Sequence, residues 1–112
     1  MILVQWSCEV PKLEREKFLN YARNKLKPFY KSNGCLRYEL FFPMKTDKKY
    51  FSYHVDVNLN RYTECLTFKE LKDFNKFYER IEKDKSAQKI VGKYRKQFKI
   101  TECSFRISIL VE

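Results

Sequence analysis

Apolar and polar side chains alternate in five short segments of this 112-residue chain, the pattern of strands with one buried face. The first is 1–8 and the second is the run NGCLRYELFF, which begins at Asn33. The others are 51–57, 61–68 and 101–111. On the first two strands one face carries Ile2, Val4, Trp6 and Cys8, and then Leu36, Tyr38, Leu40 and Phe42.

Apolar residues recur at helical spacing in two regions between these strands. The first helix is predicted to start near Pro11, and Gly34 supplies the permissive position past its end. Its apolar stripe consists of Leu13, Phe18, Ala22, Leu26 and Phe29. The second region runs over 71–81 and resumes over 85–99, as two helices or one bent helix. Over 85–99 the predicted inward residues are Ile90, Val91, Tyr94 and Phe98.

The order β-α-β-β-(β)-α-(α)-β predicts an α+β, ferredoxin-like βαββαβ fold with an antiparallel sheet, in one domain over 1–112. A possible extra strand lies in the middle meander. Two right-handed crossovers place the helices on one face of the sheet. That face should carry Ile2, Val4, Trp6, Tyr38, Leu40, Phe105, Ile107 and Ile109. The other face mixes apolar and polar residues and should find a partner. Our candidates for a dimer face are Gln5, Arg37, Glu39 and Arg106.

The register of the first and last strands also follows from the pattern. Antiparallel neighbours pair with a constant sum of positions, and a sum of 111 matches apolar with apolar residues and polar with polar ones. The predicted pairs are Ile2 with Ile109, Val4 with Ile107, Trp6 with Phe105, Cys8 with Cys103, Gln5 with Arg106 and Ser7 with Ser104. The two cysteines should therefore touch, as free thiols.

Gly34 and Cys35 before the run Tyr38-Glu39-Leu40 resemble the second strand of dimeric α/β barrel proteins of the antibiotic-biosynthesis-monooxygenase (ABM) type. The resemblance implies a homodimer joined through the sheet, and a cofactor-independent oxygenase-like enzyme or a small-molecule-binding protein. A small apolar ligand is the partner it suggests besides a second copy of the chain.

In that family the middle strand commonly carries a glutamate two residues before a tryptophan, and many members have a histidine in the next helix. If 51–57 is this strand, His54 and Asp56 stand at the two strand positions. If 62–68 is this strand, Leu66 and Phe68 stand at the two strand positions. Phe77 then stands at the histidine position, which leaves haem without a ligand.

Candidate site residues can be named, but no catalytic constellation stands out. A ligand pocket between sheet and helices could be lined by Trp6, Tyr38, Phe74, Tyr78 and Tyr94, although aromatic residues at these spacings also suit a core. His54 is a weak catalytic candidate because its ordinary pKa suits proton transfer near neutrality; the alternative is a surface position. Arg37 and Glu39 could form a cross-strand or cross-dimer ion pair, and Arg37 could instead bind an anion.

The formal charge of +10 is concentrated near the C-terminal helices. Residues 69–99 hold eleven basic and five acidic side chains. The anion-binding candidates are Lys85, Lys89, Lys93, Arg95 and Lys96. They indicate either a solvated helix face or a surface for nucleic acid or an acidic ligand, as in a nucleic-acid-binding or regulatory interaction module. An RNA-recognition domain is less favoured, because neither middle strand contains the glycine of its signature.

Four cysteines without a CxxC pair and a single histidine predict no metal site, and we expect no cofactor. We expect reduced, mostly buried thiols. The apolar opening MILV is too short for a signal peptide, and no run approaches the roughly 20 apolar residues of a membrane span. The sequence therefore predicts a cytoplasmic protein without membrane contact.

Overall fold

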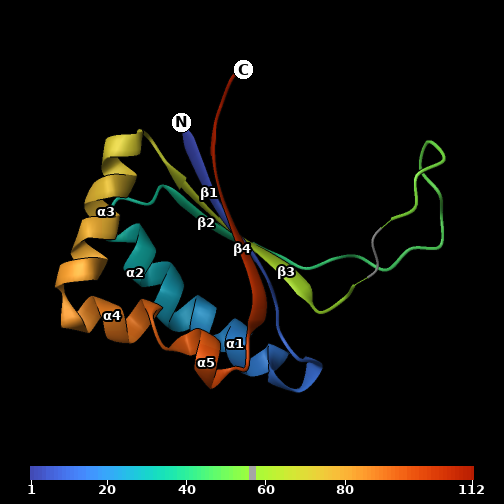
Figure 1. The fold of residues 1–112 in the computed structure, drawn as a ribbon, viewed down its shortest axis with the longest axis horizontal. Helices are drawn as coiled ribbons and strands as arrows, with labels where there is room; N and C mark the ends of the chain where they lie inside the picture. Colours follow the sequence, from blue (N-terminus) through green and yellow to red (C-terminus); the bar gives the residue numbers. More distant parts are fainter. Residues whose placement is uncertain (56–57) are drawn as a thin grey trace.

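A computed structural model describes residues 1–55 and 58–112. Its sheet has four antiparallel strands in the order β2-β3-β1-β4. They are β1 (Ile2–Glu9), β2 (Arg37–Phe41), β3 (Arg61–Phe68) and β4 (Thr101–Ile109). The helices lie together on one side of the sheet (Figure 1). The predicted α+β, ferredoxin-like arrangement is confirmed, with the first strand between the last and a middle one.

The first connection is a nearly continuous helical segment that changes its winding midway. Its parts are η1 (Lys12–Glu14), α1 (Arg15–Tyr21), η2 (Ala22–Leu26), a π-helical turn, and α2 (Lys27–Lys31). The buried residues are spaced by four: Phe18, Ala22, Leu26 and Tyr30. An α turn holds fewer than four residues, so side chains spaced by four drift slowly around an α-helix. The wider π turn offsets this drift and keeps the four buried side chains on one face. Leu13, predicted to be inward, is 90% exposed because the chain there is still a short 3₁₀ turn.

The second connection contains three helices. They are α3 (Leu71–Lys83), α4 (Lys85–Val91) and α5 (Tyr94–Gln97). The prediction of one helix over 85–99 is wrong, because α4 ends at Val91 with Gly92 as its C-cap, and α5 begins at Tyr94. The inward side was predicted correctly for Tyr94 and Phe98, which are buried, while Ile90 and Val91 are half-buried.

The core lies between the helices and strands β1, β2 and β3. Val4, Leu66 and Phe68 from the sheet meet Phe18 and the α3 aromatics there. Strand β4 is different. Phe105, Ile107 and Ile109 were predicted to be covered by helices, but they are 51%, 45% and 70% exposed. The helices do not extend over this edge strand, which leaves an apolar row open.

The predicted extra strand over 51–57 is not formed by its described part. Residues 44–55 project from the body as a long loop (Figure 1), in which Tyr50 and Tyr53 form an isolated bridge. Phe51 and Ser52 have positive φ, which is incompatible with an extended strand. Residues 56 and 57, including Asp56, lie outside the described residues. Strand β3 instead pairs with both β2 and β1, so its two edges are already occupied.

The predicted register between β1 and β4 is confirmed over Ile2 to Ser7. It shifts by one residue between Ser7 and Glu9, where Glu9 pairs with Thr101. Cys8 and Cys103 lie at this irregularity with Cα atoms 4.2 Å apart and form a disulfide. The expectation of contact is correct and that of free thiols is wrong for this pair. Cys35 and Cys65 are free and buried, as expected.

In the part of the chain that the structure describes, the helices lack the length and apolar character needed to cross a membrane.

Candidate functional site

Strand β3 carries a carboxylate into the core. Alternation along β3 places Tyr62, Glu64 and Leu66 on the face that the helices cover, and Glu64 is fully buried. The Tyr38 hydroxyl on β2 donates a 2.7 Å hydrogen bond to Oε2 of Glu64. The Tyr94 hydroxyl on α5 donates a longer one, 3.4 Å, to Oε1. A buried carboxyl group is thus held by phenols from two different elements.

Burial is the dominant influence on this group and raises the pKa of Glu64 above its ordinary value. The hydrogen bond from Tyr38, the positive charge of Arg95 and the bond from Tyr94 act in the opposite direction. Burial, followed by the nearby carboxyl, also raises the pKa of Tyr38. The arrangement therefore favours a protonated carboxyl over a wider pH range than in water.

A cavity of about 220 Å³ lies beside this cluster, between the sheet and the C-terminal helices. Its lining residues are Trp6, Tyr30, Phe74, Phe77, Tyr78, Ile81, Val91 and Arg95. We call it the aromatic cavity. Trp6 reaches it from β1, successive turns of α3 supply three of the aromatic rings, and the break at Gly92 lets α5 present Arg95.

Arg95 is the charged group of the aromatic cavity. Its guanidinium carbon lies 5.5 Å from the Trp6 ring centre and 5.2 Å from that of Tyr94, which suits cation–π contacts. Its buried Nε has no hydrogen-bond partner among the described residues, and neither has the buried Tyr62 hydroxyl. Burial, followed by the nearby Glu64, raises the pKa of Tyr62, and the charge and closeness of the Arg95 guanidinium oppose this rise. The two side chains are thus near each other, although neither the Tyr62 hydroxyl nor Nε of Arg95 has a partner at full hydrogen-bond geometry among the described residues. Arg95 therefore keeps donor capacity at the cavity wall.

The structure brings together three of the five predicted pocket residues, namely Trp6, Phe74 and Tyr78. Tyr94 is a core residue that contacts Glu64 instead. Tyr38 lines a separate groove beside the first helical segment. Phe77, which stands where the family resemblance would place a histidine, turns its ring into the aromatic cavity.

The predicted dimer-face residues lie on the open side of the sheet. Gln5 and Arg106 line a hollow of about 200 Å³ there, together with Ser7, Thr63, Ser104 and Phe105. Arg37 and Glu39 form a 2.8 Å ion pair along β2 rather than across strands, in which Arg37 is exposed and Glu39 is half-buried. Whether these residues join two copies of the chain stays a prediction.

The predicted anion-binding residues separate into two groups. Lys85, Lys89, Lys93 and Lys96 are exposed on α4, α5 and the turn between them. Arg95 is half-buried at the aromatic cavity. Their predicted role on nucleic acid stays untested; phosphate contacts would make oligonucleotide binding fall steeply with salt.

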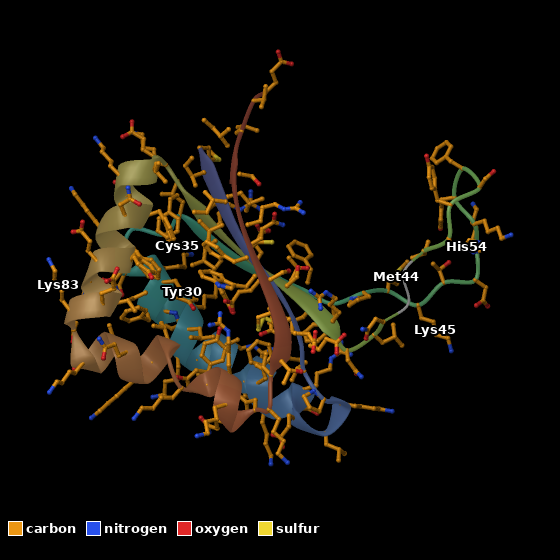
Figure 2. The ribbon with its side chains drawn as sticks, viewed as in Figure 1. Tyr30, Cys35, Met44, Lys45, His54 and Lys83 are labelled. Carbon is orange, nitrogen blue, oxygen red and sulfur yellow. A yellow bond between two sulfur atoms is a disulfide. The ribbon has the colours of Figure 1, made fainter. Side chains whose placement is uncertain are left out.

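His54 lies far from the buried carboxyl. Figure 2 places it with Met44 and Lys45 in the projecting loop, and its side chain is exposed. The described residues of the segment on which the sequence placed it, 51–55, form no strand. Its catalytic role stays a prediction, and the geometry gives it no part in the cluster around Glu64.

Glu64 is the residue that the sequence reasoning missed. The search for the family's glutamate on this strand pointed to Leu66, two residues further along. A signal was present, because Glu64 has the same parity as Tyr62, Leu66 and Phe68 and so falls on the apolar face of its strand. Burying a charged side chain on that face costs free energy unless the group is hydrogen-bonded or neutralised. A glutamate at this position could therefore have been singled out from the sequence.

No protein-family model and no curated protein matches this sequence. Solved structures do match in fold. A candidate antibiotic biosynthesis monooxygenase from Deinococcus radiodurans has a TM-score of 0.64 at 9% identity, covering 100% of this chain and 94% of that one. A MhuD mutant with two manganese protoporphyrin IX molecules per active site has a TM-score of 0.67 at 14% identity, covering 100% and 96%.

A dimeric ferredoxin-like protein from an uncultured marine organism has a TM-score of 0.63 at 11% identity, covering 99% and 94% of the two chains. At these identities the likeness shows the fold alone. The chain has the ferredoxin-like fold found in ABM-like proteins, as the sequence resemblance implied.

Proposed function

We propose that this protein binds a small aromatic molecule with an anionic group in the aromatic cavity. The observation that carries the proposal is the placement of Arg95, whose Nε lacks a hydrogen-bond partner among the described residues, beside the rings of Trp6 and Tyr78. A ligand ring would stack on the aromatic wall, and its anionic group would accept hydrogen bonds from the guanidinium.

The size of the aromatic cavity limits the ligand. A volume of about 220 Å³ lies below the roughly 300–1,000 Å³ of common ligand pockets, so a single ring fits better than a fused system. Burial raises the pKa of Glu64, so this carboxyl ionises less readily than a surface carboxylate and competes less for the charge of Arg95.

Trp6, the single tryptophan of the chain, makes the proposal easy to test. Its fluorescence should change on titration with 4-hydroxybenzoate and much less with the neutral 4-hydroxybenzamide. Arg95→Gln should weaken 4-hydroxybenzoate binding at least about tenfold, the equivalent of one charge-assisted hydrogen bond of roughly 1.5 kcal/mol. Lys96→Gln is the matched control, because it removes one exposed charge from the same helix. Equal affinity for acid and amide would refute the proposal.

A cofactor-independent oxygenase-like activity is the second candidate, and Glu64 is the observation that favours it. When ionised, a buried carboxyl group with a raised pKa is a stronger base than a surface carboxylate, which suits it to remove a proton from a phenol. Tyr94 joins Glu64 to Arg95 at the cavity wall. The test is oxygen uptake with an electron-rich phenol: Glu64→Gln should abolish any uptake that the protein accelerates and leave phenol binding intact. Uptake that persists in this variant would exclude Glu64 as the base.

We further propose that two copies of the chain associate through the open sheet face. The hollow around Gln5 and Arg106 on that face supports this. The exposed row Phe105, Ile107 and Ile109 lies on the other side of the edge strand β4, and such open apolar surface at a sheet edge also favours association. Sedimentation should show a dimer at micromolar concentration, and Arg106→Glu should weaken it. A monomer in the unmodified protein would refute the proposal without affecting the ligand test.

A further inference from the structure

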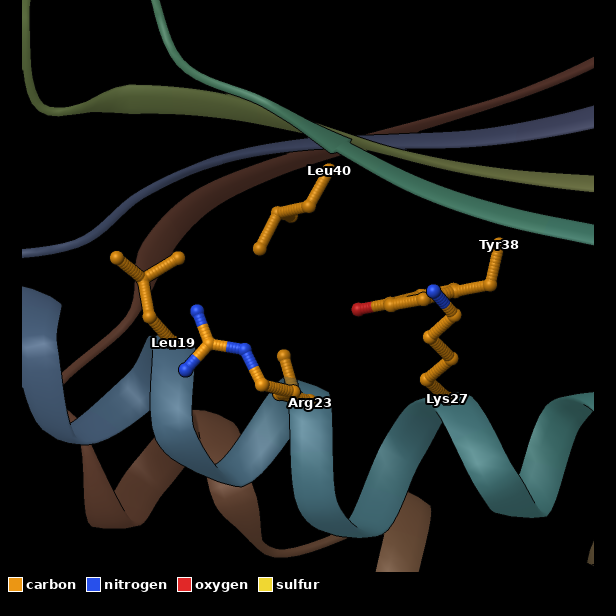
Figure 3. A pocket seen from close by; sticks show the side chains of 6 residues that line it. Leu19, Arg23, Lys27, Tyr38 and Leu40 are labelled. Carbon is orange, nitrogen blue, oxygen red and sulfur yellow. The ribbon is translucent and has the colours of Figure 1, made fainter.

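A second groove, independent of the aromatic cavity, lies between the first helical segment and the edge strand β2. Its volume is about 230 Å³. Its lining residues are Leu19, Ala22, Arg23, Lys27, Tyr38 and Leu40. In Figure 3 the side chains of Leu19, Arg23 and Lys27 rise from the helix toward Leu40 and Tyr38 on the strand.

The groove has an aliphatic floor and a cationic rim. Leu19, Ala22 and Leu40 supply the apolar surface, and Arg23 and Lys27 stand four residues apart on the helix above it. Neither cation has a carboxylate within ion-pair distance among the described residues; Arg23 makes one long contact of 3.5 Å, to Oδ1 of Asn20. The Tyr38 hydroxyl is engaged with Glu64. The two cations are therefore the polar groups free to meet a ligand.

The helix has an unusual winding at this point. Arg23 lies within the π-helical turn Ala22–Leu26, and Lys27 follows it directly. Such turns are rare and frequently lie at functional sites. Here the turn keeps Ala22 and Leu26 in the core and aims Arg23 and Lys27 along the edge strand.

We propose that this groove binds a short-chain aliphatic carboxylate, with its alkyl chain on Leu19 and Leu40 and its carboxylate between Arg23 and Lys27. The lining explains the choice of ligand. Aliphatic side chains form most of its apolar surface, in contrast to the rings of the aromatic cavity, and two cations four residues apart complement one carboxylate. The small volume excludes long-chain acids.

Backbone amide shifts in NMR spectra test the proposal, with hexanoate as probe. Hexanoate should move the amides of Leu19, Ala22 and Leu40 and leave Trp6 fluorescence unchanged, so the outcome is independent of the aromatic cavity. Hexan-1-ol tests the need for charge, and inorganic phosphate tests the need for an alkyl chain. Both should bind at least about tenfold more weakly than hexanoate, a difference of about 1.4 kcal/mol.

A pair of double variants tests whether Arg23 and Lys27 bind the carboxylate of hexanoate. Arg23→Gln with Lys27→Gln should weaken hexanoate binding about tenfold. Lys25→Gln with Lys31→Gln removes the same charge from exposed positions outside the groove and should change the affinity less than about twofold. All four side chains are exposed, so folding should be preserved. Equal weakening in both variants, shifts produced equally by phosphate or hexan-1-ol, or no saturable shift with hexanoate would each overturn the proposal.

Discussion

Replacing Glu64 with glutamine should change how the stability of the protein depends on pH. Glutamine has nearly the same shape and can still accept the Tyr38 hydrogen bond, but it cannot ionise. Because burial raises the pKa of Glu64 in the folded protein above the ordinary 4.5, the folded state keeps this proton at pH values where the unfolded chain has lost it.

The sign and size of the effect follow from this difference in bound protons. Below about pH 4.5 the folded and the unfolded states both carry the proton, and Glu64 makes its full contribution to the free energy of unfolding. As pH rises toward the pKa of the folded protein, the folded state binds up to one proton more than the unfolded state. Its free energy of unfolding then falls by as much as about 1.4 kcal/mol per pH unit. Above that pKa the loss stops growing.

Urea unfolding followed by circular dichroism between pH 4 and 8 measures the effect. As pH rises, the free energy of unfolding of the original protein should fall relative to that of Glu64→Gln. The new buried amide adds a difference of about 1–3 kcal/mol between the two proteins that does not change with pH. Glu79→Gln, at an exposed position on α3, is the control and should change stability by less than about 0.5 kcal/mol. Parallel curves for the protein and Glu64→Gln would refute the raised pKa. A gap that grows in favour of the original protein would mean an ionised carboxylate stabilised by Arg95.

Three further predictions concern stability. Tyr38→Phe should lower the free energy of unfolding by about 1.5–3 kcal/mol, and Tyr94→Phe by less, because its hydrogen bond is 3.4 Å rather than 2.7 Å long; equal losses in urea unfolding would contradict the ranking. Cys103→Ser removes a disulfide that spans 95 residues and should cost about 2–5 kcal/mol, and a melting temperature equal to that of the oxidised protein would argue against the bond. Arg37→Ala should cost less than about 1 kcal/mol, since its ion pair with Glu39 is exposed; a larger loss would place the pair in an interface.

The sequence by itself determined the frame of this protein. Period-two alternation located β1, β2, β3 and β4, and the order of elements implied the crossovers and helices on one face. The register of β1 against β4 followed from matching polar with polar positions, because one step of slip would turn every side chain to the wrong face. These features depend on local pattern and chain connectivity, so a sequence can predict them.

Alternation was misleading where no partner strand was available. The segment 51–57 has a strand-like pattern, but β3 pairs on both sides with other strands, and the described residues of the segment form part of a projecting loop. The sequence predicted correctly which face of the sheet the helices cover, but not how far across that face they extend. Phe105 and Ile107 stay exposed because the breadth of the helical layer depends on how the helices pack.

The candidate site depended most on tertiary structure. Trp6, Phe74 and Tyr78 could be nominated from their spacing, whereas the cluster around Glu64 could not. Its hydrogen bonds join residues 26 and 30 positions apart in the chain, from β2 and α5. The pKa of a carboxyl group depends on its burial and its neighbours. Folding supplies both, so its role was decided only when the sheet and the helices came together.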